Sequence, residues 1–346
     1  MVKRQNVLDS INSGLHQAFT SDSRVYLLGE DILDPYGGAF RVSRGLSTAF
    51  PKRIWTTPIS EAGIVGIATG MAMRGLLPVV EIMFGDFMTL AADQIINHLS
   101  KFAWMYSGGK SPADRVTVPI VIRTPMGGRR GYGPTHSQTL EKLFLGVPGL
   151  KIVAPTHFGN PGNLIVHAIL KDQDPIIFIE NKLQYLLPLE NPETNLDFEQ
   201  FVDNGSQGYP TYILKLHSAP SPQITIAAYG YMAELARRTM LRLAYENEIF
   251  CELVNPTIIA PFDISIIAES AQRTRHLLIL EEGTLTLGWG AEIISRVVEK
   301  FELQPLAFKR VATLESPIPA SGPLEAAVIP GEEQILQACV GILQQR

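Results

Sequence analysis

The feature that most constrains this chain is the regular alternation of short apolar runs with segments of helical periodicity in its first half. The apolar runs predict strands at 25–29, 77–83, 119–125, 151–155 and 175–180, and the periodic segments predict helices at 61–74, 86–105, 135–147 and 161–171. Strands and helices that alternate in this way form a parallel sheet covered by helices. We therefore expect a doubly wound α/β domain over residues 1–186.

The alternation breaks off after this domain and then resumes. Residues 187–222 are rich in Pro, Asn, Glu and Ser, a composition that predicts a linker. Beyond it, strands are predicted at 224–229, 249–254 and 276–281, and helices at 232–246, 263–273 and 291–301. The sequence thus predicts a second, smaller α/β domain over residues 223–346.

The composition excludes several classes of function. With 46% hydrophobic residues, 18% charged residues and a net charge of −5, the chain is typical of globular proteins and unsuited to nucleic acid or an acidic membrane. No apolar run has the length of a membrane span, and the N-terminus is amphipathic where a signal peptide would be apolar. Cys251 and Cys339 stand outside any metal-binding spacing. We therefore expect a cytoplasmic protein without a nucleic-acid or membrane partner.

One carboxylate stands at the start of an otherwise apolar helix that contains several glycines. Glu61 follows Pro58 and lies in the predicted first turn, where the helix dipole favours an anion. That dipole contact alone is one sufficient reason for a Glu at this position. However, Gly63, Gly66 and Gly70 each weaken the helix by about 1 kcal/mol relative to Ala, a cost expected where a backbone or ligand approaches closely. Glu61 is therefore a candidate to face such a ligand.

A second candidate follows the strand predicted at 119–125. Residues 127–133 contain four glycines, and His136 comes next, near the predicted start of a helix. The N–H groups of a helix start lower the pKa of a histidine and bind anions, so a neutral imidazole there is able to exchange protons near pH 7. The alternative is that Thr135 or Ser137 caps the helix and His136 has no chemical role. Both interpretations stay open on this pattern alone.

Six segments of the chain occur together and in a fixed order. They are Gly29-Glu30-Asp31, 36–46, 57–66, 93–97, 136–138 and 148–151. In this order they resemble the beta subunit of the thiamine-diphosphate-dependent 2-oxoacid dehydrogenase E1 component. The resemblance implies the fold of the transketolase-like enzymes, in which a pyrimidine-binding domain precedes a transketolase C-terminal domain. That arrangement agrees with the two α/β domains expected above.

The resemblance also implies roles for individual residues. Glu61 matches the glutamate that hydrogen-bonds N1′ of the cofactor's aminopyrimidine and promotes loss of the proton from the thiazolium carbon. Phe87 matches the aromatic residue that packs on the pyrimidine, and Ile59 and Met83 match its apolar surroundings. Ordinary core packing is the alternative for Phe87 and Met83. His136 matches the histidine that faces the substrate and assists acyl transfer to a lipoyl arm.

Half of the cofactor site is missing from this chain, as the resemblance further implies. Related enzymes hold Mg²⁺ and the diphosphate through a Gly-Asp-Gly motif and a later Asn pair, whereas here Gly85-Asp86 continues into Phe87 and no Asn pair exists. We therefore expect an alpha subunit to supply this half within an α₂β₂ heterotetramer. Some relatives also bind potassium, and Asp172 is the residue nearest to such a site.

Three functions are compatible with these observations. The leading one is an E1 beta subunit that decarboxylates a 2-oxoacid and transfers the acyl group to the lipoyl group of an acyltransferase, E2. The second is a carboligase or transketolase-like subunit with another acceptor. It is favoured if Arg129 and Arg130 bind a substrate anion, although a solvated charge pair explains them equally well. The third is a non-catalytic partner subunit, against which Glu61 and His136 argue. The divergent segment Asn255-Pro256-Thr257 leaves docking of E2 open.

Overall fold

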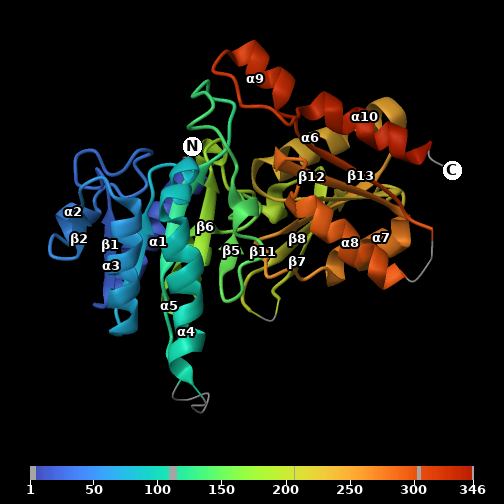
Figure 1. Ribbon diagram of the computed structural model, residues 1–346. Coiled ribbons are helices and arrows are strands. Elements are labelled where there is room, and N and C mark those ends of the chain that lie inside the picture. The colour runs from blue at the N-terminus through green and yellow to red at the C-terminus, as the bar shows by residue number, and fades with distance from the viewer. Residues whose placement is uncertain (1–4, 109–114, 206, 302–304, 345–346) are drawn as a thin grey trace. The chain divides into compact units, whose positions relative to one another are not determined.

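The computed structural model describes residues 5–108, 115–205, 207–301 and 305–344. The chain divides into two compact units, each built around its own sheet (Figure 1). The first unit comprises Met1–Met126 and Leu143–Leu189, and the second comprises Gly127–Lys142 and Glu190–Arg346. No helix in the described ranges is long and apolar enough to cross a membrane. The expected class, two α/β units, is confirmed.

The sheet of the first unit contains six parallel strands of this unit in the order β5-β6-β4-β3-β1-β2. Their bounds are β1 Val25–Gly29, β2 Ile54–Thr56, β3 Leu77–Glu81, β4 Val121–Met126, β5 Lys151–Val153 and β6 Ile176–Asn181. Strands β3 and β4 are buried at every position, which explains their continuous apolar runs. The direction of winding reverses between β1 and β3. Ligands of open α/β sheets bind at such a switch point, beyond the carboxyl ends of the strands.

The α-helices described for this unit are α1 Val7–Ser21, α2 Leu46–Ala49, α3 Glu61–Met73, α4 Ser100–Ser107 and α5 Pro161–Leu170 (Figure 1). Helices α1 and α5 touch through Gly14 and Gly162, where an added Cβ would collide with the facing backbone. The helix predicted at 86–105 is divided into a 3₁₀ helix, η1 (Gly85–Ala91), a π-helix, η2 (Gln94–Leu99), and α4. The predicted strands and the other helices of this unit, apart from 135–147, agree with the structure to within a few residues.

A buried ion cluster connects β3, β4 and β6 near the carboxyl ends of β3 and β6. The Arg123 guanidinium donates hydrogen bonds to both carboxylate oxygens of Glu180, at 2.9 and 2.6 Å, and another to Glu81. Tyr185 donates to Glu180 at 2.6 Å, and Ser43 donates to Glu81. Loss of one partner from a buried ion pair typically costs 3–5 kcal/mol, because an uncompensated charge remains. These contacts therefore fix the strand ends beside the switch point.

The sheet of the second unit has the order β13-β12-β9-β10-β8-β7. Its strands are β7 Phe198–Asp203, β8 Thr211–Leu216, β9 Ile224–Ala228, β10 Cys251–Pro256, β12 His276–Thr284 and β13 Ala307–Thr313, and a short strand, β11 (Ile258–Ala260), follows β10. Strands β13, β12, β9 and β10 pair in parallel, whereas β8 and β7 form an antiparallel edge.

The predicted linker at 187–222 therefore contains two strands of this sheet. The prediction missed them because β7 lies at the sheet edge and only Phe198 of its six residues is buried. Its polar positions, including Glu199, Gln200 and Asp203, conceal the apolar pattern of a strand. The neighbouring prolines and serines were correct signals of turns, but not of a long irregular segment.

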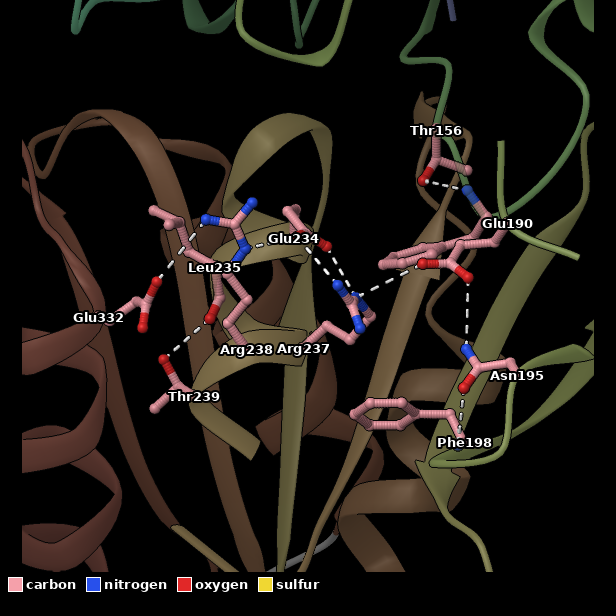
Figure 2. Close-up of polar contacts among 11 residues, drawn as sticks. Thr156, Glu190, Asn195, Phe198, Glu234, Leu235, Arg237, Arg238, Thr239 and Glu332 are labelled. Atoms are coloured by element: carbon pink, nitrogen blue, oxygen red, sulfur yellow. Dashed lines mark hydrogen bonds and ion pairs between the residues drawn. The ribbon is translucent and has the colours of Figure 1, made fainter. Parts of the chain in front are cut away.

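Helices of the second unit are α6 Gly230–Asn247, α7 Ser265–Thr274, α8 Trp289–Phe301, α9 Gly322–Val328 and α10 Glu332–Leu343. An ionic cluster on α6 connects several of its neighbours, as Figure 2 shows. The buried carboxylate of Glu234 accepts hydrogen bonds from Arg237, at 2.8 Å, and Arg238, at 2.6 Å. Arg237 also lies 3.9 Å from Glu190, and Arg238 lies 3.9 Å from Glu332 of α10. The cluster thus ties α6 to α10 and to the segment before β7.

The two cysteines meet in the core of the second unit. Cys251 on β10 and Cys339 on α10 are free thiols and both are buried. A hydrogen bond with Cys339, together with burial, raises the pKa of the Cys251 thiol well above its usual value. Because the thiolate is the reactive form, this shift lowers the reactivity of Cys251.

A buried carboxyl group lies within the second unit near the end of β12. Burial raises the pKa of Glu281 to about 7, although a hydrogen bond from the Gly290 N–H, at 3.2 Å, opposes the shift. The nearby charge of Glu141 raises it further. The Glu281 Oε1 atom has no hydrogen-bond partner in the part of the chain that the structure describes. A Cβ at Gly288 would collide with this carboxylate, which requires glycine there.

We predict that Glu281→Gln changes the pH dependence of stability. The ordinary pKa of the group is 4.5, so the folded chain holds the proton more tightly than the unfolded chain does. Its stabilising contribution is complete below about pH 4.5 and is lost as the pH rises through 7. Glutamine keeps an acceptor for Gly290 but does not ionise. The free energy of unfolding of the variant should therefore gain about 2 kcal/mol on wild type between pH 5.5 and 8.

Urea denaturation at both pH values measures this difference, with Glu292→Gln as the control because Glu292 is an exposed carboxylate on α8. A difference between variant and wild type that is the same at both pH values would contradict the prediction.

Candidate functional site

The residues that the resemblance assigns to the cofactor follow two strands of the first unit: Ile59 and Glu61 follow β2, and Met83 follows β3. Glu30, which was not assigned from the sequence, comes directly after β1, the strand between them. These strands are adjacent in the order β3-β1-β2 and parallel, so their carboxyl ends share one edge of the sheet. Between β1 and β3 lies the switch point. The sheet therefore brings these separate segments to the place where ligands of this architecture bind.

Helix α3 begins at Glu61, as predicted. Ser60 is its N-cap, and the Ser60 hydroxyl accepts a hydrogen bond from the Gly63 N–H at 3.3 Å. Only 6% of Glu61 is exposed. A carboxylate this deeply buried requires compensation from a hydrogen-bond donor or a positive charge. The dipole of α3 supplies part of it.

A second carboxyl group lies beside Glu61, and its role was not recognised from the sequence. Burial raises the pKa of Glu30, and the neighbouring charge of Glu61 raises it further, against a backbone hydrogen bond from Ser60. The Glu30 Oε1 and Thr57 Oγ1 atoms are buried, and neither has a hydrogen-bond partner among the residues described. The available signal was the position of Glu30, directly after the first strand of a doubly wound sheet. This edge therefore presents unsatisfied polar groups next to two carboxyl groups.

Aromatic rings follow β3, whose carboxyl end shares this edge of the sheet. The rings of Phe84 and Phe87 meet edge to face with centroids 6.0 Å apart, and Phe40 meets Phe84 at 5.6 Å. Phe87 and Met83 are each partly exposed, whereas Ile59 is 82% exposed. Full burial in the core, the alternative for Phe87 and Met83, is therefore not what the structure shows. The first unit leaves apolar surface open at this edge.

These groups fit the pyrimidine end of thiamine diphosphate. An aminopyrimidine offers ring nitrogens and an amino group to carboxyl and hydroxyl partners, and it offers a flat face to an aromatic side chain. Glu30, Thr57 and Glu61 are the residues that would make the first kind of contact, and Phe87 is the residue that would make the second. Among the described residues no group of three or more His, Cys, Asp or Glu side chains could hold a metal ion.

The segment that carries His136 differs from the prediction. No helix spans 135–147: residues 134–136 form a turn, and only a 3₁₀ turn, η4 (Glu141–Leu143), follows. Side chains of this segment contact other parts of the second unit; for example, the Tyr229 hydroxyl donates a hydrogen bond to Glu141. These tertiary contacts take the place of helical backbone hydrogen bonds. The helix-start arguments for His136 and for caps at Thr135 or Ser137 are therefore wrong. Instead, the Thr135 hydroxyl lies 2.9 Å from Nδ1 of His136 and orients the ring.

Arg129 is committed to the second unit. Its guanidinium donates a hydrogen bond to the Pro330 carbonyl and lies 5.9 Å from the centre of the Tyr231 ring. Its backbone, at φ +67°, donates to Glu325 at 2.7 Å. Arg130 is partly buried and also engaged in contacts. The structure therefore assigns Arg129 an anchoring role, and an anion site at this pair loses its main support.

Asp172, the expected potassium position, faces a cation that the chain itself supplies. The Lys151 ammonium lies 2.9 and 2.8 Å from the two carboxylate oxygens of Asp172 and 3.3 Å from Asp174. Lys151 is mostly buried, so this pair is well shielded from solvent. The positive charge that a monovalent ion would bring is already present there.

Comparisons with protein families agree with both units. The transketolase pyrimidine-binding domain matches residues 4–186, and the transketolase C-terminal domain matches residues 215–335. A solved structure described as a split-gene transketolase, an inactive beta4 tetramer, superimposes with a TM-score of 0.73 and covers 97% of both chains. At 18% identity that similarity shows the fold alone.

Curated relatives match almost the whole chain. The beta subunit of the mitochondrial pyruvate dehydrogenase E1 component from Drosophila melanogaster is 34% identical over 345 residues, 99% of this chain and 90% of the relative. The Homo sapiens subunit is 36% identical over 340 residues, 96% of this chain and 89% of the relative. The beta-1 subunit from Arabidopsis thaliana is 34% identical over 338 residues, 97% of this chain and 88% of the relative.

These relatives contradict the expected cytoplasmic location, because each is named as a mitochondrial protein. The prediction rested on composition and on unpaired cysteines, and neither distinguishes one reducing compartment from another. Two findings show the family of this chain: the matches to both transketolase domains, and the relatives that align over nearly its whole length. The chain belongs to the thiamine-diphosphate-dependent, transketolase-like enzymes, within the family of pyruvate dehydrogenase E1 beta subunits.

Proposed function

We propose that this chain decarboxylates a 2-oxoacid, together with an alpha subunit, and transfers the acyl group to the lipoyl group of an acyltransferase, E2. The observation that carries the proposal is the pair of carboxyl groups, Glu30 and Glu61, beside partnerless polar atoms at the switch point of the first sheet. A carboxyl group such as Glu30, whose pKa is raised by burial and by a neighbouring charge, is a candidate for a functional site.

Bound thiamine diphosphate supplies the nucleophilic carbon for decarboxylation. Glu61 holds a proton at N1′ of the pyrimidine, in a site where low solvent access strengthens a hydrogen bond. Phe87, Met83 and Ile59 hold the ring through apolar contact and keep water from it. His136, oriented by Thr135, exchanges a proton with the substrate during acyl transfer.

The exposed surface of α3 supports a partner subunit. This helix is apolar on nearly every side, which is typical of a helix that is covered all round. Yet Ile67 is 57% exposed, and nothing lies within 4 Å of a Cβ placed on Gly70. We propose that another chain covers this face in an α₂β₂ assembly and that the alpha subunit provides Mg²⁺ and the diphosphate site.

We also propose that the pyrimidine-binding domain comprises residues 1–186 and that the C-terminal domain comprises residues 223–346 together with the β7–β8 hairpin.

Replacement of Glu61 tests the chemical role directly. Glutamine retains the size of the side chain and cannot exchange the proton, so we expect Glu61→Gln to lower kcat at least about 100-fold. The assay is 2-oxoacid-dependent dye reduction by the chain co-purified with its alpha subunit. Glu246→Gln, at an exposed position on α6, is the control and should retain full activity. Unchanged turnover in Glu61→Gln would show that the chain is a non-catalytic partner.

The acceptor is tested separately. In an assay without the dye, we expect addition of a lipoylated E2 domain to accelerate product formation from the 2-oxoacid. Added aldehydes should leave the rate unchanged. The carboligase alternative predicts the reverse. The commitment of Arg129 to Pro330 and Glu325 has removed the main observation in favour of that alternative.

A further inference from the structure

The loop that carries His136 is held by two buried carboxylates of the second unit. The Gly128 N–H donates a hydrogen bond to Glu282 at 2.7 Å. The N–H groups of Arg129 and Gly131 donate to the two oxygens of Glu325, at 2.7 and 3.0 Å. Glu282 lies near the end of β12 and is 4% exposed, and Glu325 lies on α9 and is 3% exposed. Three backbone amides in four residues thus point at carboxylates that do not belong to the loop.

The glycines of this loop let it lie close to neighbouring residues of the second unit. A Cβ at Gly128 would collide with Ile329, and one at Gly131 would lie 3.0 Å from the Ala320 carbonyl oxygen. Gly131 also adopts φ +68°, which L side chains rarely do. The close approach that the glycines permit is therefore to residues 320–329 of this chain, which include α9.

The other end of the segment is held as well. The Lys142 ammonium donates to the Thr284 hydroxyl and, at 2.8 Å, to the Thr286 carbonyl. Tyr229 donates to the buried carboxylate of Glu141. His136 lies between these two sets of anchors, and its ring is oriented by its own neighbour, Thr135.

We propose that Glu325 is a positioning residue for His136, and that it acts by clamping the Arg129 and Gly131 amides. This inference rests on the proposed function for the role of His136, whereas the clamp itself does not. Both Glu325 oxygens are occupied by separate N–H donors, so glutamine cannot replace it: the amide nitrogen would face a donor. Hydrogen bonds to a charged group are the strong class, and their loss releases the Arg129 and Gly131 amides while Glu282 still holds Gly128.

The clamp is tested by hydrogen–deuterium exchange, resolved to single amides, on the full chain co-purified with its alpha subunit. In Glu325→Gln we expect exchange of the Arg129 or Gly131 amide to accelerate at least about tenfold. The Gly128 amide, held by Glu282, should stay protected. Leu324→Ala, an exposed position on the same helix, is the control and should exchange like wild type. Protection of both amides in Glu325→Gln would overturn the proposal.

The link to His136 is tested by a double-mutant cycle. Glu325→Gln should lower kcat about tenfold and leave the dissociation constant of thiamine diphosphate unchanged, because the pyrimidine-binding residues belong to the other unit. In a His136→Ala background it should cause no further loss, since residues that act as a unit are not additive. Losses in kcat that multiply would overturn the positioning role. If wild type shows no 2-oxoacid turnover, the proposed function fails, and amide exchange alone decides the clamp.

Discussion

The arrangement at the edge of the first sheet depends on one buried ionic contact, between Arg123 and the carboxylates of Glu81 and Glu180. Glu81 and Glu180 stand at or near the carboxyl ends of β3 and β6, and Arg123 lies within β4, the strand between them. Ser43 and Tyr185 bind the same carboxylates, so the loop before α2 and the turn after β6 join the cluster. A Cβ at Gly38 would also collide with Glu81. The ionic contact thus orders the segments that surround the switch point.

Buried carboxyl groups in both units differ in whether the chain supplies their hydrogen-bond donors. Glu325 and Glu282 accept hydrogen bonds from the amides of the His136 loop. Glu30 has a buried oxygen without a partner within the described residues, as has Glu281 in the second unit. An unsatisfied buried acceptor is costly. At Glu30 it lies beside Glu61 and the switch point of the first sheet, and this combination supports the proposed cofactor site.

Periodicity was sufficient to predict the fold class and most elements, because each buried parallel strand is a continuous apolar run. Long-range contacts were not predictable in this way. The antiparallel strand β7 is mostly polar because it lies at the sheet edge. The 135–147 segment forms side-chain contacts with residues about a hundred positions away in place of the backbone hydrogen bonds of a helix. Glu61 was found because helix-start rules are local. The role of Glu30 and the partners of Arg129 could not be predicted in this way, because they depend on which strands and loops become neighbours in space.

The central claim is that this chain holds only the pyrimidine half of a thiamine diphosphate site. Isothermal titration calorimetry of thiamine diphosphate with Mg²⁺ tests it most directly, on the chain alone and on the complex co-purified with its alpha subunit. We expect tight binding, at one cofactor for each alpha and beta pair, by the complex and little or no heat from the chain alone. Tight binding by the isolated chain would contradict the account.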